Sequence, residues 1–93
     1  MADAKLIKAV KLARGMTGDF EEENSRLGIK IDMVIGLMVD GGISQSVANS
    51  EASAGVIAKG IDDIEYNGGK LSEFFWQRAI QLVYTTPTNG EVE

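Results

Sequence analysis

Residues 51–66 read EASAGVIAKGIDDIEY, and this stretch predicts the central helix of the fold. Its apolar side chains recur at steps of three or four residues, as one face of an α-helix requires: Val56, Ile57, Ile61 and Ile64. Much of the remainder is alanine and glycine, which allows neighbouring helices to approach closely, although each interior glycine costs about 1 kcal/mol relative to alanine. Ser50 is the expected N-cap, and Asn67-Gly68-Gly69 is the expected stop.

Three further helices are expected on either side of this stretch, over about Ala2–Arg14, Asp19–Asp40 and Glu73–Tyr84. In the first, Lys5, Lys8 and Lys11 are expected to face outward. The second is the longest and ends at the glycine pair 41–42. Its apolar stripe consists of Phe20, Leu27, Ile31, Val34, Ile35 and Met38. Residues 43–50 form a polar connector with room for one helical turn, and Ser72 is the expected cap of the last helix.

The fold class predicted from this pattern is all-α. Residues 1–84 are expected to form one small bundle of about four helices, and residues 85–93 a flexible, extended C-terminal tail. The tail contains the only proline of the chain and has no apolar periodicity. A length of 93 residues suits one domain, and 44% apolar with 25% charged residues is ordinary for a globular protein.

The composition argues against catalysis. The chain has no histidine and no cysteine, so it lacks the usual general base, the thiol nucleophile and the commonest metal ligand. We expect no enzymatic activity, no cofactor and no metal. The net charge of −5 is the wrong sign for gripping phosphates, and no apolar run is long enough to cross a bilayer. A protein made in the cytoplasm, with no membrane association, is expected.

Two local patterns suggest ligand binding but are incomplete. Residues 63–68 resemble the first half of a calcium loop, yet the position of the closing glutamate holds Phe74, so a helix end is the preferred interpretation. Residues 43–60 resemble a helix-turn-helix, which would make the protein a small DNA-binding regulator. Lys59 is the only basic residue of the recognition helix in that alternative, whereas phosphate anchoring usually needs several.

The aromatic run Phe74-Phe75-Trp76, followed by Arg78, is the strongest candidate for a binding surface. Consecutive residues on a helix point about 100° apart, so the three rings cannot all face one core. At least one is left for a second surface, and these residue types are enriched at the centres of protein interfaces. We therefore expect Phe74, Phe75, Trp76 and Arg78 to pack either the bundle itself or a neighbouring subunit or partner, and the sequence leaves open which of the three rings is buried.

Three segments together resemble the head–tail connector (adaptor) proteins of long-tailed double-stranded DNA bacteriophages. They are residues 53–64 (SAGVIAKGIDDI), residues 67–72 (NGGKLS) and residues 75–82 (FWQRAIQL). Members of that family show a small-residue helix ending near an aspartate, a glycine turn, a Leu-Ser-Pro step and an Arg-x-x-Gln-Leu helix. This chain departs from the pattern at Glu73, where the family often has proline, and in its unusually basic first helix. The resemblance extends over most of residues 1–84 and is most specific in residues 53–82.

The resemblance implies a structural protein of the virion neck. Such proteins form a homo-oligomeric, cyclic ring beneath the portal protein, and they extend the channel through which the genome DNA passes without specific binding. A further neck or tail-completion protein would lie below the ring. The tail segment, with Tyr84, Thr85, Thr86, Pro87 and Thr88, would dock against the portal. The helix-turn-helix regulator, and an accessory factor without chemistry of its own, remain the alternatives.

Overall fold

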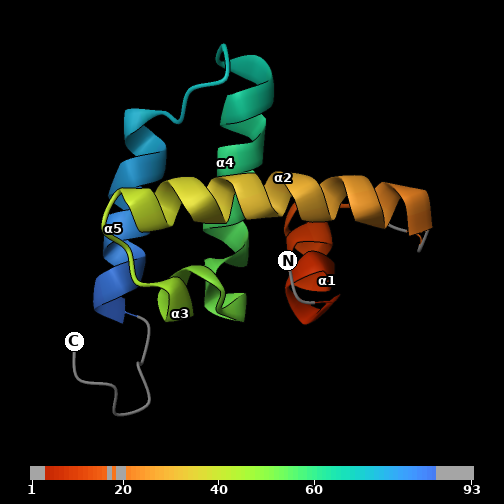
Figure 1. The fold of residues 1–93 in the computed structure, drawn as a ribbon, viewed down its shortest axis with the longest axis horizontal. Coiled ribbons are helices and arrows are strands. Elements are labelled where there is room, and N and C mark those ends of the chain that lie inside the picture. The colour runs from red at the N-terminus through yellow and green to blue at the C-terminus, as the bar shows by residue number, and fades with distance from the viewer. Residues whose placement is uncertain (1–3, 17, 19–20, 86–93) are drawn as a thin grey trace.

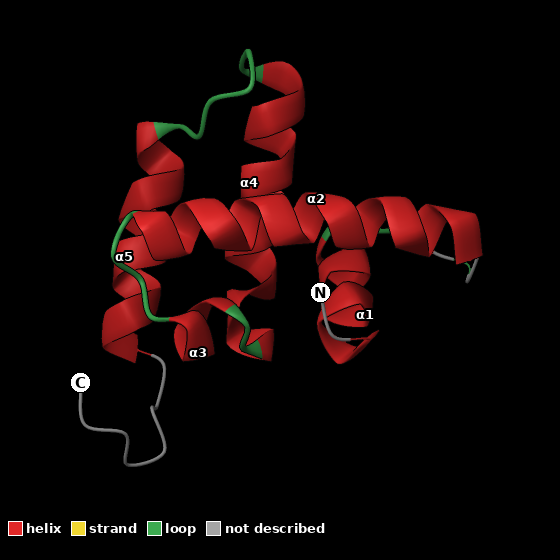
Figure 2. Cartoon of the chain, in the orientation of Figure 1, coloured by secondary structure: helices red, strands yellow, loops and turns green. Residues whose placement is uncertain are grey.

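The structure, a computed structural model, describes residues 4–16, 18 and 21–85. Every regular element in these residues is helical, and Figure 2 shows helices joined by loops with no strand among them. The elements are α1 (Ala4–Ala13), α2 (Glu21–Asp40), α3 (Gln45–Ala48), the 3₁₀ turn η1 (Glu51–Ser53), α4 (Ala54–Tyr66) and α5 (Glu73–Thr85). The all-α prediction is confirmed.

Helix α4 lies at the centre of the arrangement. It packs against α1, α2 and α5, and η1 leads directly into it. Figure 1 shows α2 crossing in front of α4 and α5, with α1 near the N-terminal end of α2. With 20 residues, α2 extends about 30 Å and forms one broad side of the molecule.

The predicted apolar stripes form the core. In α2 the buried residues are Leu27, Ile31, Val34, Ile35 and Met38, as the spacing indicated, while Phe20 lies outside the described residues. On α4, Val56, Ile57 and Ile61 are buried and Ile64 packs partly against them. Leu6 and Val10 of α1 close the core from the side.

Three of the four predicted helix boundaries are confirmed. Helix α4 ends at Tyr66, followed by Asn67 and the left-handed Gly68 and Gly69, as expected. Gly42 has a φ of 102°, and the amide of Ile43 donates to the carbonyl of Met38, so α2 ends on a left-handed glycine. Ser72 Oγ accepts a hydrogen bond from the amide of Phe75 and caps α5. Ser50, in contrast, makes no side-chain cap; its hydroxyl donates to the carbonyl of Val47, and the chain passes through η1 before α4 begins.

The prediction for Lys11 is wrong. This lysine is buried, whereas Lys5 and Lys8 are exposed. Its ammonium donates to the carbonyl oxygen of Gly18 at 2.5 Å and to Oδ1 of Asn24 at 2.8 Å. The charge is thus satisfied by the chain that follows α1, and the aliphatic stem is free to pack against the bundle.

The predicted boundary between domain and tail moves by one residue. Thr85 is the last residue of α5, and its hydroxyl donates to the carbonyls of Gln81 and Leu82. Thr86, Pro87 and Thr88, with the rest of the predicted tail to residue 93, lie outside the described residues. The predicted starts of the first two helices, Ala2 and Asp19, lie outside them as well.

Candidate interaction surfaces

Helix α5 distributes its three aromatic side chains over three environments. Phe75 is fully enclosed in the core, Trp76 is half-buried, and Phe74 is 54% exposed. The rings of Phe75 and Trp76 meet edge to face with centroids 5.2 Å apart. Because Phe75 has no exposed surface, it packs the bundle, and Phe74 is the most exposed of the three rings.

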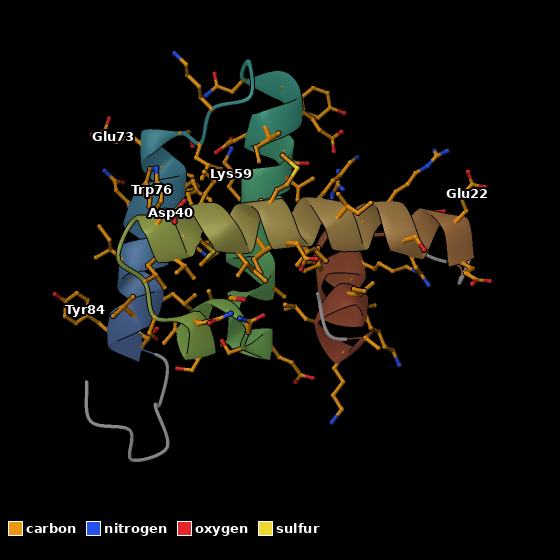
Figure 3. All side chains as sticks on the ribbon, viewed as in Figure 1. Glu22, Asp40, Lys59, Glu73, Trp76 and Tyr84 are labelled. Carbon is orange, nitrogen blue, oxygen red and sulfur yellow. The ribbon has the colours of Figure 1, made fainter. Side chains whose placement is uncertain are left out.

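Two glycines make room for the buried rings. A Cβ atom on Gly60 would lie 2.7 Å from Cε1 of Phe75 and 2.9 Å from Cγ1 of Val34. A Cβ atom on Gly41 would lie 2.7 Å from the indole of Trp76, which Figure 3 shows beside the C-terminal end of α2. Gly60 sets how closely α5 and α2 approach α4, and Gly41 sets how closely the end of α2 approaches α5. The sequence marked them only as small residues or helix stops.

A buried carboxylate joins α4 to the start of α5. Oδ2 of Asp63 accepts hydrogen bonds from the hydroxyl of Ser72 at 2.6 Å and from its amide at 3.0 Å. Oδ1 forms an ion pair with Lys59 at 3.1 Å. Burial alone would raise the pKa of Asp63, but the Ser72 hydrogen bonds and the Lys59 ammonium outweigh it, so its pKa is lowered. Asp63 thus holds the α4–α5 turn together.

The first candidate surface, the Phe74 flank, lies on α5 beside α4 and consists of Phe74, Arg78 and Lys59. The ammonium of Lys59 lies 5.7 Å from the centroid of the Phe74 ring, within the range of a cation–π contact. Arg78 is exposed and forms no ion pair with any residue that the structure describes. An exposed aromatic ring beside two cations suits a partner that offers carboxylates or further aromatic groups.

The second candidate surface, the α5 outer face, consists of Ile80, Val83 and Tyr84. All three are exposed, and Tyr84 is 85% exposed. In Figure 3 the Tyr84 side chain points away from the bundle. Ile80, Val83 and Tyr84 are spaced by three and four residues, so they form one continuous apolar strip on the helix. The sequence analysis did not identify Ile80 or Val83 as surface residues, although their spacing from Tyr84 places all three on one side of the helix.

The third candidate surface, the α2 outer face, is centred on Ile29, Met33 and Leu37. These side chains are 64%, 51% and 39% exposed. They follow one another at four-residue steps on the side of α2 opposite its buried stripe. Single exposed apolar residues are ordinary, but three in register on the longest helix form a patch that indicates a binding surface. This face was not identified from the sequence.

Within residues 4–16, 18 and 21–85, no three His, Cys, Asp or Glu side chains gather where they could hold a metal ion. In place of the suggested calcium loop, Asp63 is engaged with Ser72 and Lys59. Nor does any helix of the described chain have the length and apolar character needed to cross a membrane.

Comparisons with known proteins found no match. No family model, no curated protein and no solved structure is significantly similar to the chain.

Proposed function

We propose that this protein is a structural subunit of a bacteriophage neck, with no chemistry of its own. In this proposal, copies of the chain form a cyclic ring that joins the portal of the capsid to the tail and extends the DNA channel. The observation that carries the proposal is the presence of two separate apolar surfaces, the α2 outer face and the α5 outer face, on so small a chain. The sequence resemblance to connector proteins supports it.

A cyclic ring requires each subunit to have two different binding surfaces, one for each neighbouring subunit. In a cyclic assembly each copy presents one face to the neighbour on its left and another to the neighbour on its right. The α2 outer face and the α5 outer face lie on different helices. The α2 outer face of one copy can therefore bind the α5 outer face of the next, and each copy still has its other face available for a second neighbour. The Phe74 flank, with Arg78, lies beside the α5 outer face and would extend this contact.

The charge of the chain agrees with a conduit for DNA. A lining that bound phosphates strongly would hold the genome in place, because each phosphate neutralised by a lysine or arginine adds affinity. The chain has 14 acidic and 9 basic residues. Of the basic ones, Lys11, Arg14, Lys30 and Lys59 are already engaged with oxygen atoms of the chain. In the proposed neck, DNA would therefore pass without specific binding.

The geometry favours a connector over a DNA-binding regulator. In the regulator, the N-terminal part of α4 would enter the major groove, which requires an exposed helix face. Here α4 is packed by α1, α2 and α5, and the hydroxyl of Ser53 donates inward to the carbonyls of Ala48 and Ser50. Lys59, the cation of that segment, is paired with Asp63.

Ring formation is the first experiment. Light scattering and negative-stain imaging of the purified chain with the portal protein of the same phage are expected to show a closed ring. Replacing Ile80 and Tyr84 together (Ile80→Asp, Tyr84→Ser) should abolish the ring while the circular dichroism spectrum is unchanged. Lys70→Ala, an exposed substitution in the α4–α5 loop, serves as the matched control. A dimer whose DNA affinity falls steeply with salt would instead support the regulator.

Portal docking is tested separately. The resemblance gave Tyr84, Thr85, Thr86, Pro87 and Thr88 as the docking segment. Because Tyr84 and Thr85 lie on α5, the proposal keeps the portal contact for residues 86–93. A further neck or tail-completion protein binds the opposite side of the ring. Deleting residues 86–93 should leave α1–α5 folded and abolish co-purification with the portal. Undiminished portal binding by the truncated chain would remove the docking role from this segment.

A further inference from the structure

The exposed residues of α2 are arranged symmetrically about Met33. Ile29 lies four residues before Met33 and Leu37 four residues after it, and both are exposed apolar side chains. If two α2 helices lie antiparallel and cross at Met33, Ile29 of each copy faces Leu37 of the other. The two Met33 side chains then meet on the axis. An isologous contact has this pattern, in which residue i meets j and j meets i.

The charges on the same face follow the same symmetry with opposite signs. Arg26 lies seven residues before Met33, and Asp40 lies seven residues after it. Seven residues are close to two helical turns, so both charges share the side of α2 that carries Met33. In the antiparallel arrangement, Arg26 of each copy faces Asp40 of the other, and the two ion pairs bracket the apolar centre.

Neither Arg26 nor Asp40 makes a strong ion pair within one chain. Asp40 is the last residue of α2, where the negative end of the helix dipole disfavours a carboxylate, and it forms no ion pair with any described residue. Arg26 pairs with Glu22 one turn away, but both side chains are largely exposed, 74% and 80%. An exposed pair of this kind contributes little, so Arg26 can exchange Glu22 for a partner across an interface.

Gly36 adds an independent observation. It lies inside α2 on the exposed side, where a glycine costs about 1 kcal/mol relative to alanine. No atom lies within 4 Å of the position that its Cβ would occupy, so packing within the chain does not require a glycine here. A glycine three residues from Met33 does, however, allow a second helix to approach closely, because the distance between helix axes depends on the side chains at the contact.

We propose that the α2 outer face binds the α2 outer face of a second copy, in an antiparallel pair with twofold symmetry. This goes beyond the proposed function and does not depend on it. In a ring the same face would meet a different face of the next copy, so the symmetric pair belongs to the free protein and competes with ring formation. The apolar α2 outer face would then be covered before assembly begins.

The pair is expected to be weak and sensitive to salt. Three apolar side chains and one flanking charge at each end place it at the small end of protein interfaces. Its ion pairs lie at the solvent-exposed rim, where added salt screens them. Sedimentation velocity over a range of protein concentrations, at low and high salt, is therefore the appropriate measurement.

Charge exchange provides the test. Arg26→Glu and Asp40→Lys, each made in the full chain, should weaken self-association at least about tenfold, since each places two like-charge contacts in the symmetric pair. Mixing the two variants should restore association, because both contacts in the mixed pair then join opposite charges. The double variant should restore it as well. Lys70→Glu, in the exposed α4–α5 loop, is the control and should associate like the original chain.

Several results would overturn the pair. A chain that is monomeric at every concentration has no such contact, and a mixture that associates no better than the single variants rules out the Arg26–Asp40 register. A closed ring that forms from the original chain and is indifferent to both charge reversals would also overturn it, while supporting the proposed function. A dimer that obeys the charge-exchange pattern supports the pair whether or not a ring is later found on the portal.

Discussion

Gly60 and Gly36 both lie inside helices, yet their surroundings are opposite. At Gly60, where α2, α4 and α5 meet, an added Cβ would lie 2.7 Å from Phe75 and 2.9 Å from Val34. At Gly36, on the α2 outer face, nothing lies within 4 Å of that position. The first glycine is needed because the chain fills all the space around it. The second faces open space at the surface of α2.

This contrast separates stability from binding in the molecule. The crossing at Gly60 is close-packed, so changes of even one methyl group there should alter the free energy of unfolding. Substitutions on the α2 outer face should alter that free energy little and act instead on association.

Phe75→Ala should have the largest effect. Removing a fully buried ring leaves a cavity, so we expect the free energy of unfolding to fall by about 3–5 kcal/mol. Its neighbour provides the comparison: Phe74→Ala removes a half-exposed ring and should cost less than about 1 kcal/mol. Urea denaturation of both variants measures the difference. Equal losses would show that the two rings are not in the different environments described.

Gly60→Ala should destabilise the chain although alanine is the better helix former. The new methyl group must displace the Phe75 ring or Val34, and overpacking of this kind costs about 1–3 kcal/mol. Thermal unfolding followed by circular dichroism measures the shift. A stabilised Gly60→Ala variant would mean that α4 and α5 cross less closely than 2.7 Å implies.

Asp63→Asn should remove a pH-dependent contribution to stability. The lowered pKa of Asp63 means that the folded state favours the carboxylate. Its stabilising contribution is therefore present above the unfolded-state pKa of about 3.9 and is lost as the pH falls through the lower folded-state pKa. Above pH 5 the substitution should cost about 1–3 kcal/mol. The cost should shrink below pH 4 in urea denaturation; a cost that is constant with pH would exclude this linkage.

Gly36→Ala should have the smallest effect on folding and the opposite sign. With open space around the new methyl group, the variant should gain about 0.4–1 kcal/mol in stability at dilute, monomeric concentrations. The same methyl group should weaken the proposed α2 pair, because it holds the two helices apart. Denaturation and sedimentation on the same sample measure the two effects. A Gly36→Ala variant that gains stability and still pairs fully would remove the glycine from the pairing argument.

Local patterns predicted most of the fold. The three- and four-residue spacing of Leu27, Ile31 and Met38 correctly gave the buried side of α2, because periodicity reports directly which residues share a face. Gly42 and Ser72 correctly marked helix ends, since left-handed backbone and N-capping are local effects.

The sequence-based predictions failed where a contact between residues far apart in the chain determines the environment of a side chain. The spacing of Phe74, Phe75 and Trp76 shows that their side chains point in different directions from the helix. Which of them faces the core depends on where α5 crosses α4. Lys11 was expected to face outward, and only the position of Gly18 and Asn24 shows that its ammonium is satisfied inside. Ser50 had the residue type of a cap, but its hydroxyl bonds backward to Val47. The partner surfaces of this chain remain predictions.

The Asp63–Ser72 contact has a consequence for the order of folding. It closes a loop of only nine residues, and Ser72 at the same time caps α5, so one short closure aligns two helices. The entropy lost on closing a loop grows with its length, so we expect this hairpin to form at low cost before α1 and α2 pack against it. We expect Ser72→Ala to slow folding in proportion to the stability that it removes, in stopped-flow measurements. The turn between α4 and α5 would then be the nucleus on which the rest of the bundle assembles.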